Sequence, residues 1–187
     1  MLTESVICFS LWQAAKRASA ELRKIRPTNA IGIERKRIAV EFLDEVRRTD
    51  LALSELHERI DHAVKAADTS VTDVFGVGPI VACYLIGYSG DVRRFPSAGH
   101  YARYNATAPI EASSGPRVRH RLNLNGNRQL NHAIHLAAVT QIAHDTPGRA
   151  YYRAKQAARK SRKEAMRCLK RRISDTVYRQ LRADLDD

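Results

Sequence analysis

The sequence predicts a mainly α-helical protein with little or no β structure. Residues 33–67 carry a seven-residue repeat of apolar side chains with no Pro or Gly inside it. Three further stretches, at 79–88, 97–104 and 127–143, have the patterns and capping residues of helices. An apolar stripe with helical spacing closes the chain: Met166, Leu169, Ile173, Val177 and Leu181.

The N-terminal segment, residues 1–30, is predicted as a helical lead-in that ends at Arg26, because the residue before a proline disfavours the helical conformation. Its apolar run, Val6 to Trp12, is too short to span a bilayer and lacks a preceding basic stretch. We therefore expect neither a membrane segment nor a signal peptide. The cysteines are odd in number and far apart, which excludes a disulfide scaffold: Cys8, Cys83 and Cys168.

Residues 31–68 are predicted to form one long coiled-coil-like helix. All nine core positions of the repeat except Thr49 are apolar. The nine positions are Ala39, Phe42, Val46, Thr49, Leu53, Leu56, Ile60, Ala63 and Ala67. Such spacing is typical of a coiled-coil seam, and equally of a helix packed antiparallel on its own domain. Apolar residues beside the seam widen the face, so both interpretations stay open.

The net charge of +12, with a pI near 10.1, favours an acidic partner, nucleic acid first. Residues 148–182 concentrate this charge, holding thirteen Lys or Arg against Glu164 and Asp175. The alternative is an ordinary solvated helix face, but this density favours phosphate contact. The candidate binding residues here are Lys160, Arg162, Lys163, Lys170, Arg171 and Arg172.

Residues 69–187 form the predicted C-terminal domain, which begins with a glycine turn. Phe75-Gly76-Val77-Gly78-Pro79, followed by an apolar helix, resembles a helix-hairpin-helix motif. The amides at the start of that helix could hold a DNA phosphate without reading its sequence. The alternative is a simple glycine turn between two core helices, and Cys83 in the apolar helix is expected in the core.

A Ser-Gly loop at residues 112–121 can present a hydroxyl beside basic side chains. Ser113 and Ser114 precede Gly115-Pro116, and Arg117, Arg119 and Arg121 follow. A serine that attacks a phosphodiester needs stabilisation of charge, which arginines supply, and a proton acceptor, for which His120 and Glu111 are the nearby candidates. Spacing alone favours an ordinary turn here. His132 and His135 have a metal-ligand spacing without a third ligand, which favours structural or phosphate-facing roles.

Linked motifs cover most of the chain from about Arg26 to Leu181. They read VFGVGPIVACYLIGYSGDVRRFPS, YNATAPIEASSG, GNRQLNHAIHLAAV, HDTPGRAYYRAK and RKEAMRCLKRRISDTVYRQL. In this order they resemble the insertion-sequence transposases related to the Piv-type site-specific DNA invertases. In that family an acidic RuvC-like domain precedes a coiled coil and a C-terminal serine transposase domain. The chain resembles the last two parts.

The resemblance implies transposition by DNA strand exchange, with Ser114 as the nucleophile that becomes joined to a DNA phosphate. It implies DNA as partner, a structured bridge RNA as a second partner, and a homo-oligomer or a complex with full-length transposase through residues 33–67. It also implies the bacterial cytoplasm as location and no membrane. The residues in nucleic-acid-binding motif positions are Gly76, Gly78, Arg117, Arg119, Arg121, Asn127 and Arg128.

The sequence departs from the family at several points. Glu4 and Glu21 are isolated carboxylates, so the acidic domain has no counterpart in residues 1–30. We therefore expect no metal site or cofactor in this chain, magnesium only together with such a domain, and no activity of the chain alone. Ala106 and Arg159 stand where relatives commonly carry glycine. Two other functions stay open: a non-catalytic nucleic-acid-binding remnant and a dimerisation partner of a full-length transposase.

Overall fold

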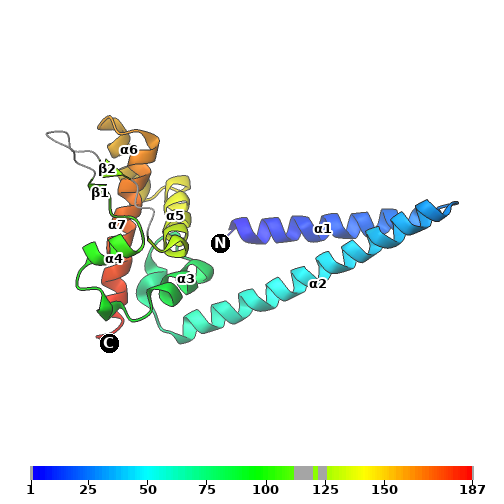
Figure 1. Cartoon of the computed structure of the whole chain (residues 1–187), viewed down its shortest axis with the longest axis horizontal. Helices are drawn as coiled ribbons and strands as arrows, with labels where there is room; N and C mark the ends of the chain where they lie inside the picture. Colours follow the sequence, from blue (N-terminus) through cyan, green and yellow to red (C-terminus); the bar gives the residue numbers. More distant parts are fainter. Residues whose placement is uncertain (1, 112–119, 122–125, 187) are drawn as a thin grey trace. The chain divides into compact units, whose positions relative to one another are not determined.

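The computed structural model describes residues 2–111, 120–121 and 126–186, and it describes the side chains of residues 13–109 and 126–186. The prediction of a mainly α protein is confirmed: the described part contains seven α-helices and one pair of two-residue strands (Figure 1). The chain divides into two compact units, residues 1–59 and 60–187, with the boundary inside the second helix.

The first unit is an αα-hairpin. Helix α1 (Leu2–Lys24) ends just before Arg26-Pro27, as predicted, and helix α2 (Ala30–Ala66) follows after a short turn. Asn29 starts α2, since its Oδ1 accepts a hydrogen bond from the Gly32 amide at 2.7 Å. The Lys36 ammonium on α2 donates to the backbone carbonyl of Ile25 at 2.9 Å. This hydrogen bond holds the turn between α1 and α2 against the N-terminal part of α2.

Helix α2 confirms the long helix predicted from the seven-residue repeat. Its seam stays largely exposed in the chain: Phe42 is 64% and Val46 is 42% exposed. Charged side chains pair along its surface, as Arg37 does with Glu34 and Glu41. That a helix of another chain packs on this seam as a coiled coil stays a prediction. The exposed apolar side chains of the seam are compatible with it.

The second unit holds the remaining elements. They are the 3₁₀-helices η1 (Ser70–Asp73) and η2 (Val92–Arg94), the helices α3 (Pro79–Ser89), α4 (Ala98–Tyr104), α5 (Arg128–Ala143), α6 (Pro147–Ala157) and α7 (Arg162–Ala183), and the strands β1 (Ile110–Glu111) and β2 (His120–Arg121). The strands pair antiparallel, with Ile110 opposite Arg121. The helices predicted at 79–88, 97–104 and 127–143 are α3, α4 and α5.

Side-chain caps set where these helices begin. Ser97, Asn127 and Thr146 each accept a hydrogen bond from an amide of the first turn of α4, α5 and α6. Ser161 and Glu164 form a complete capping box at the start of α7. The segment before Phe75 forms only the short η1. Thr69 caps η1, because Asp68 takes a positive φ of 44° that turns the chain.

Helix α7 is the central element of the unit. Helices α4, α5 and α6 all pack against it (Figure 1). The predicted apolar stripe faces this packing: Leu169, Ile173, Val177 and Leu181 are buried and Met166 is partly buried. Each buried Leu, Ile or Val contributes about 1.5–3 kcal/mol relative to exposure, so this one face of α7 is a large part of the unit's stability.

Helix α3 is apolar on every side, yet only one face is buried. Ala82 and Leu85 are fully buried, whereas Cys83, Tyr84 and Tyr88 are exposed. The prediction that Cys83 lies in the core is therefore wrong. Successive helical residues point about 100° apart, so a helix that packs on one side exposes the neighbours of its buried positions.

Two positions where relatives commonly carry glycine adopt left-handed backbone here. Ala106 has φ 58° and Arg159 has φ 63°. A non-glycine residue in this region pays a steric cost of roughly 1 kcal/mol or more. At Ala106 the space is tight as well, because a Cβ on Gly126 would lie 2.6 Å from the Ala106 Cβ.

A carboxylate closes the unit at the C-terminal end of α7. Asp184 accepts hydrogen bonds from the Thr69 hydroxyl at 2.7 Å and from the Ser70 amide at 3.0 Å, and Ser70 Oγ donates as well. Burial raises the pKa of Asp184, but these hydrogen bonds outweigh it and hold the pKa below its usual value.

We expect Asp184→Asn to lower the free energy of unfolding at pH 7 by about 1 kcal/mol, after allowance for solvent screening of a half-exposed carboxylate. Because the folded pKa is depressed, the stabilisation is complete above the unfolded pKa and is lost as pH falls through the folded pKa. Urea unfolding at pH 7 and at about pH 2.5 measures both. Asp186→Asn, at an exposed neighbour, is the control, and an equal loss at both pH values would contradict this role.

Candidate nucleic-acid interface

The glycine turn before α3 gives its two glycines different tasks. Gly76 has φ 88°, and a Cβ there would lie 2.8 Å from the carbonyl oxygen of Ala137 on α5. Packing therefore requires this glycine. Gly78 is exposed, is the N-cap of α3, and has open space where a Cβ would be.

The start of α3 leaves backbone amides without a side-chain cap, with Pro79 in the first turn. Helix-terminal amides with an exposed glycine are suited to phosphate contact. The element before the turn is the 3₁₀-helix η1. Gly76 packs on α5, which agrees with the alternative interpretation that this is a purely structural glycine turn. Phosphate binding by a helix-hairpin-helix at Gly76 and Gly78 stays a prediction.

Asn127 joins α4 to α5. Its side-chain Oδ1 caps α5. Its backbone N–H donates to the backbone carbonyl of Tyr104 at 2.6 Å, and its side-chain Nδ2 donates to the Tyr104 hydroxyl at 3.3 Å. This hydrogen bond and the nearby Arg94 guanidinium hold the pKa of Tyr104 below its usual value. The Asn127 side chain is thus occupied by structure, while Arg128 beside it is exposed.

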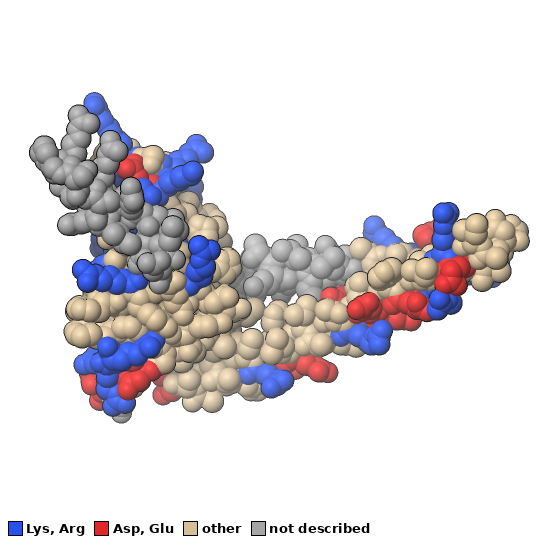
Figure 2. All heavy atoms as spheres, in the orientation of Figure 1, with Lys and Arg blue, Asp and Glu red and all other residues tan. Residues whose placement is uncertain are grey.

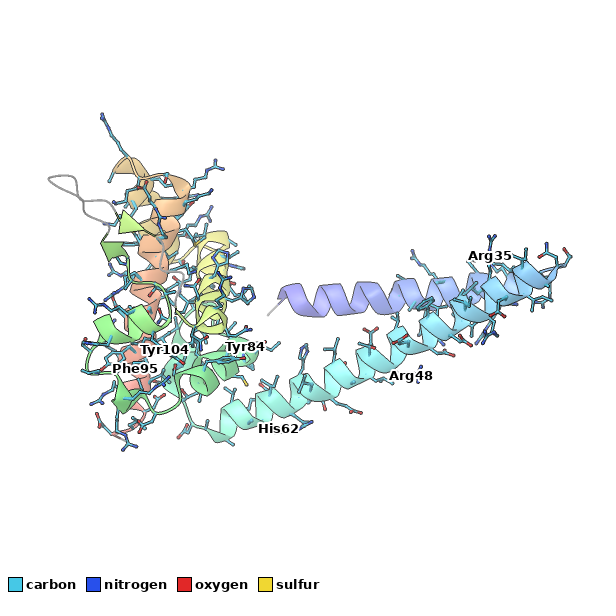
Figure 3. All side chains as sticks on the ribbon, in the orientation of Figure 1. Arg35, Arg48, His62, Tyr84, Phe95 and Tyr104 are labelled. Carbon is cyan, nitrogen blue, oxygen red and sulfur yellow. The ribbon has the colours of Figure 1, made fainter. Side chains whose placement is uncertain are left out.

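Arg94 lies against two neighbouring aromatic rings at this joint, whose centres are 5.1 Å apart. Its guanidinium carbon is 4.5 Å from the ring centres of both Phe95 and Tyr104, which lie together in Figure 3. Arg94 also donates to the Ser89 carbonyl at 3.1 Å. The sequence analysis did not single out this residue, because its partners come from α3, η2 and α4.

The residues of the Ser-Gly loop stand between β1 and β2 in the sequence. Ser114, Arg117 and Arg119 lie outside the described residues, and Arg121 is described only by its backbone in β2. In the β1–β2 pair, Glu111 stands opposite His120.

The basic residues of the C-terminal part cover α6 and the first half of α7, and Figure 2 shows Lys and Arg gathered at this end of the unit. We define the α6–α7 surface as the residues Arg149, Arg153, Lys155, Arg159, Lys160, Arg162, Lys163, Arg167 and Arg172. Arg171 is different, because its Nε pairs with Asp175 at 3.0 Å. Glu164 accepts the hydrogen bonds of the capping box and is engaged there.

Arg162 and Lys163 stand in the first turn of α7. Positive charge at a helix N-terminus opposes the helix dipole and costs stability. Neither residue serves the fold in this position, which favours an anionic partner for them.

An aromatic ring lies within the α6–α7 surface. Lys155 Nζ is 5.1 Å and the Arg172 guanidinium carbon 4.9 Å from the ring centre of Tyr151. Lys155 follows Tyr151 by four residues, so that contact follows from the sequence. Arg172 comes from α7, and only the tertiary fold reveals its contact.

The crossing of α5 and α7 contains a further basic side chain. Lys170 is half-buried, and its ammonium donates to Asn131 Oδ1 at 2.6 Å. Burial lowers the pKa of Lys170 to about 8. The pKa of His135 is lowered as well, by burial first and then by the positive charges of Lys170 and His132.

Comparison with known proteins gives this unit a family likeness. Residues 68–153, from the turn before η1 into α6, match the model described as "Transposase IS116/IS110/IS902 family". This segment is similar to the transposase domain of that insertion-sequence family. The coarse part of the predicted resemblance is thereby confirmed, and the relation to Piv-type invertases stays a prediction.

One curated relative is the "Insertion element IS110 uncharacterized 43.6 kDa protein" of Streptomyces coelicolor. It is 34% identical over 113 residues, which make up 60% of this chain. The chain covers 28% of the length of that relative. Activities of a whole transposase therefore come to this chain only as proposals.

The described residues contain neither a metal-binding cluster nor a membrane-spanning helix. No three His, Cys, Asp or Glu side chains among them come together as a metal site, His132 and His135 included. No described helix is long and apolar enough to cross a membrane.

We expect Gly76→Ala to lower the free energy of unfolding by about 2 kcal/mol or more, because it combines a positive φ with a contact to the Ala137 carbonyl. Gly78→Ala is the matched control and should cost only a few tenths of a kcal/mol as an N-cap change. Urea unfolding of both variants measures the difference. Equal costs would contradict the assignment of Gly76 to packing.

Proposed function

We propose that this chain is the DNA-binding and strand-exchange part of an insertion-sequence transposase. The observation that carries the proposal is the match of residues 68–153 to the transposase family, in the same unit as the α6–α7 surface. The family match supports a role in transposition. The binding surface and the serine chemistry are the finer parts of the proposal.

The α6–α7 surface is the proposed site of DNA contact. Seven basic side chains lie on α6 and α7, and Arg159 and Lys160 lie in the turn between them. Both acidic residues of α7 are engaged, Glu164 in the capping box and Asp175 with Arg171. Contacts of this kind neutralise phosphates and release counterions, so they bind without reading sequence. Tyr151, with its cationic neighbours Lys155 and Arg172, adds a ring on which an unpaired base could stack.

Ser114 is the proposed nucleophile. Its Oγ would attack a DNA phosphorus, forming a Ser–O–P bond while the phosphodiester bond to one side breaks and its oxygen leaves with a proton. Attack by a hydroxyl of another strand would reverse the step and release the serine. Arg117, Arg119 and Arg121, close in sequence, would stabilise the charge of both transition states.

The remaining partners follow from the family resemblance and belong to the assembled transposase. They are a bridge RNA, magnesium held by an acidic domain, and a second helix on the exposed seam of α2. Phe42, Val46, Leu53 and Leu56 on that seam are exposed and offer apolar surface for such a helix.

We expect the double variant Arg162→Gln/Lys163→Gln to weaken binding of duplex DNA without lowering stability, because both charges oppose the dipole of α7. Each lost phosphate contact should reduce the slope of log affinity against log salt by about 0.9, so the slope falls by up to about two. Fluorescence anisotropy at several salt concentrations measures it. Arg35→Gln in α2, also exposed, is the control, and equal slopes for all three proteins would place DNA elsewhere.

We expect Ser114→Ala to abolish a covalent protein–DNA adduct that the parent chain forms when mixed with a full-length transposase of its element. Ser113→Ala, one residue earlier, is the matched control and should keep the adduct. Denaturing gels of labelled DNA detect the Ser–O–P bond. Adduct formation by Ser114→Ala would refute the nucleophile, and DNA binding by a parent that never forms an adduct would favour a non-catalytic binding module.

A further inference from the structure

We propose that Lys170, His132 and His135 form a partly buried binding site for one phosphodiester group of a nucleic-acid strand. The site lies where α5 crosses α7, apart from the exposed arginines and lysines of the α6–α7 surface. The inference rests on the proposed function, because it presumes that a nucleic acid lies on this unit. It goes further by naming the position at which one phosphate is held by a shaped site.

The first support is the unpaired state of the Lys170 ammonium. Among the described residues, one of its three N–H groups has an acceptor, the neutral Asn131 Oδ1 at 2.6 Å. A half-buried ammonium with a neutral partner loses hydration without gaining a counter-charge. The depressed pKa of about 8, caused by burial, reports the same cost.

The second support is the lack of carboxylates around this position. Helices α4, α5 and α6, which pack on α7, contain no acidic residue. The two acidic residues of α7 are engaged elsewhere, Glu164 in the capping box and Asp175 with Arg171. The remaining acidic group on an element that packs on α7 is Asp73 in η1, which is exposed.

The third support is a chain of hydrogen bonds that holds Lys170 in place. Asn131 Nδ2 donates to the Asn105 carbonyl at 2.8 Å, and Asn105 Nδ2 donates to Ser174 Oγ at 2.7 Å. Asn105 and Ser174 are fully buried. Lys170 is therefore fixed through α4, α5 and α7 at once, whereas the lysines of the α6–α7 surface end in solvent.

The histidines supply the remaining cationic groups. His132 and His135 lie one turn apart on α5, with His132 exposed and His135 half-buried. The positive charges of Lys170 and His132 both lower the pKa of His135, after the larger effect of burial, and Asn131, which accepts from Lys170 at 2.6 Å, is the residue next to His132 on α5. A phosphodiester, with one negative charge and two acceptor oxygens, supplies the charge and the acceptors that these groups lack.

The test compares Lys170→Gln with Lys163→Gln in the full chain, using one oligonucleotide sequence as single-stranded DNA, duplex DNA and RNA. We expect Lys170→Gln to weaken binding about tenfold and Lys163→Gln about two- to threefold, as for a site-bound against a solvated charge. The form of nucleic acid with the largest loss at Lys170 identifies which strand occupies the site. His132→Gln/His135→Gln should weaken binding of the same form.

Two further readouts separate this site from a structural role. Thermal unfolding of Lys170→Gln should be unchanged or improved, since an uncompensated charge is removed. The pKa of the Lys170 ammonium, followed by NMR, should rise by about one unit or more when the oligonucleotide binds. An unmoved pKa, with Lys170→Gln no weaker than Lys163→Gln, overturns the site alone, whereas a parent chain that binds no nucleic acid overturns the proposed function with it.

Discussion

The second unit depends on the burial of one face of α7. Leu169, Ile173 and Val177 hold α4, α5 and α6 in place at once. The apolar side chains of α7 are concentrated on this buried face. The remaining positions of the helix do not contribute to the core and can carry basic side chains. The same helix therefore stabilises the unit and carries the charge that a nucleic acid would meet, and its N-terminal turn accepts unfavourable charge because its centre is so firmly packed.

Polar groups inside this packing give it a single arrangement. Buried Asn105 satisfies its side chain with Ser174 and Thr107, and its carbonyl accepts from Asn131. A buried amide left without partners costs about 1–3 kcal/mol, so a rotated or shifted α7 would be penalised. Such networks define the position of side chains at their edge, as Lys170 shows.

Much of this fold could be predicted from the sequence, because periodicity and caps are local. The repeat in α2, the stripe in α7 and the caps Ser97 and Asn127 each act within a few residues. The exposure of Cys83 could not be predicted, since α3 is apolar on every side and only its packing selects a face. Lys170, His132 and His135 were each named from the sequence, but their grouping could not be predicted for a related reason, because it depends on how α5 packs on α7. The contacts of Arg94 were missed because its partners are far apart in the sequence. The serine loop stays a prediction from resemblance.

Asp184 has a consequence for the architecture of the second unit as a module. By bonding Thr69 and Ser70, it brings the last turn of α7 to the point where the chain leaves α2. A unit whose entry and exit lie side by side can be inserted into a loop of a host protein, or its ends joined and new ones opened, with little disturbance of either fold. The second unit is therefore suited to domain insertion and to circular permutation.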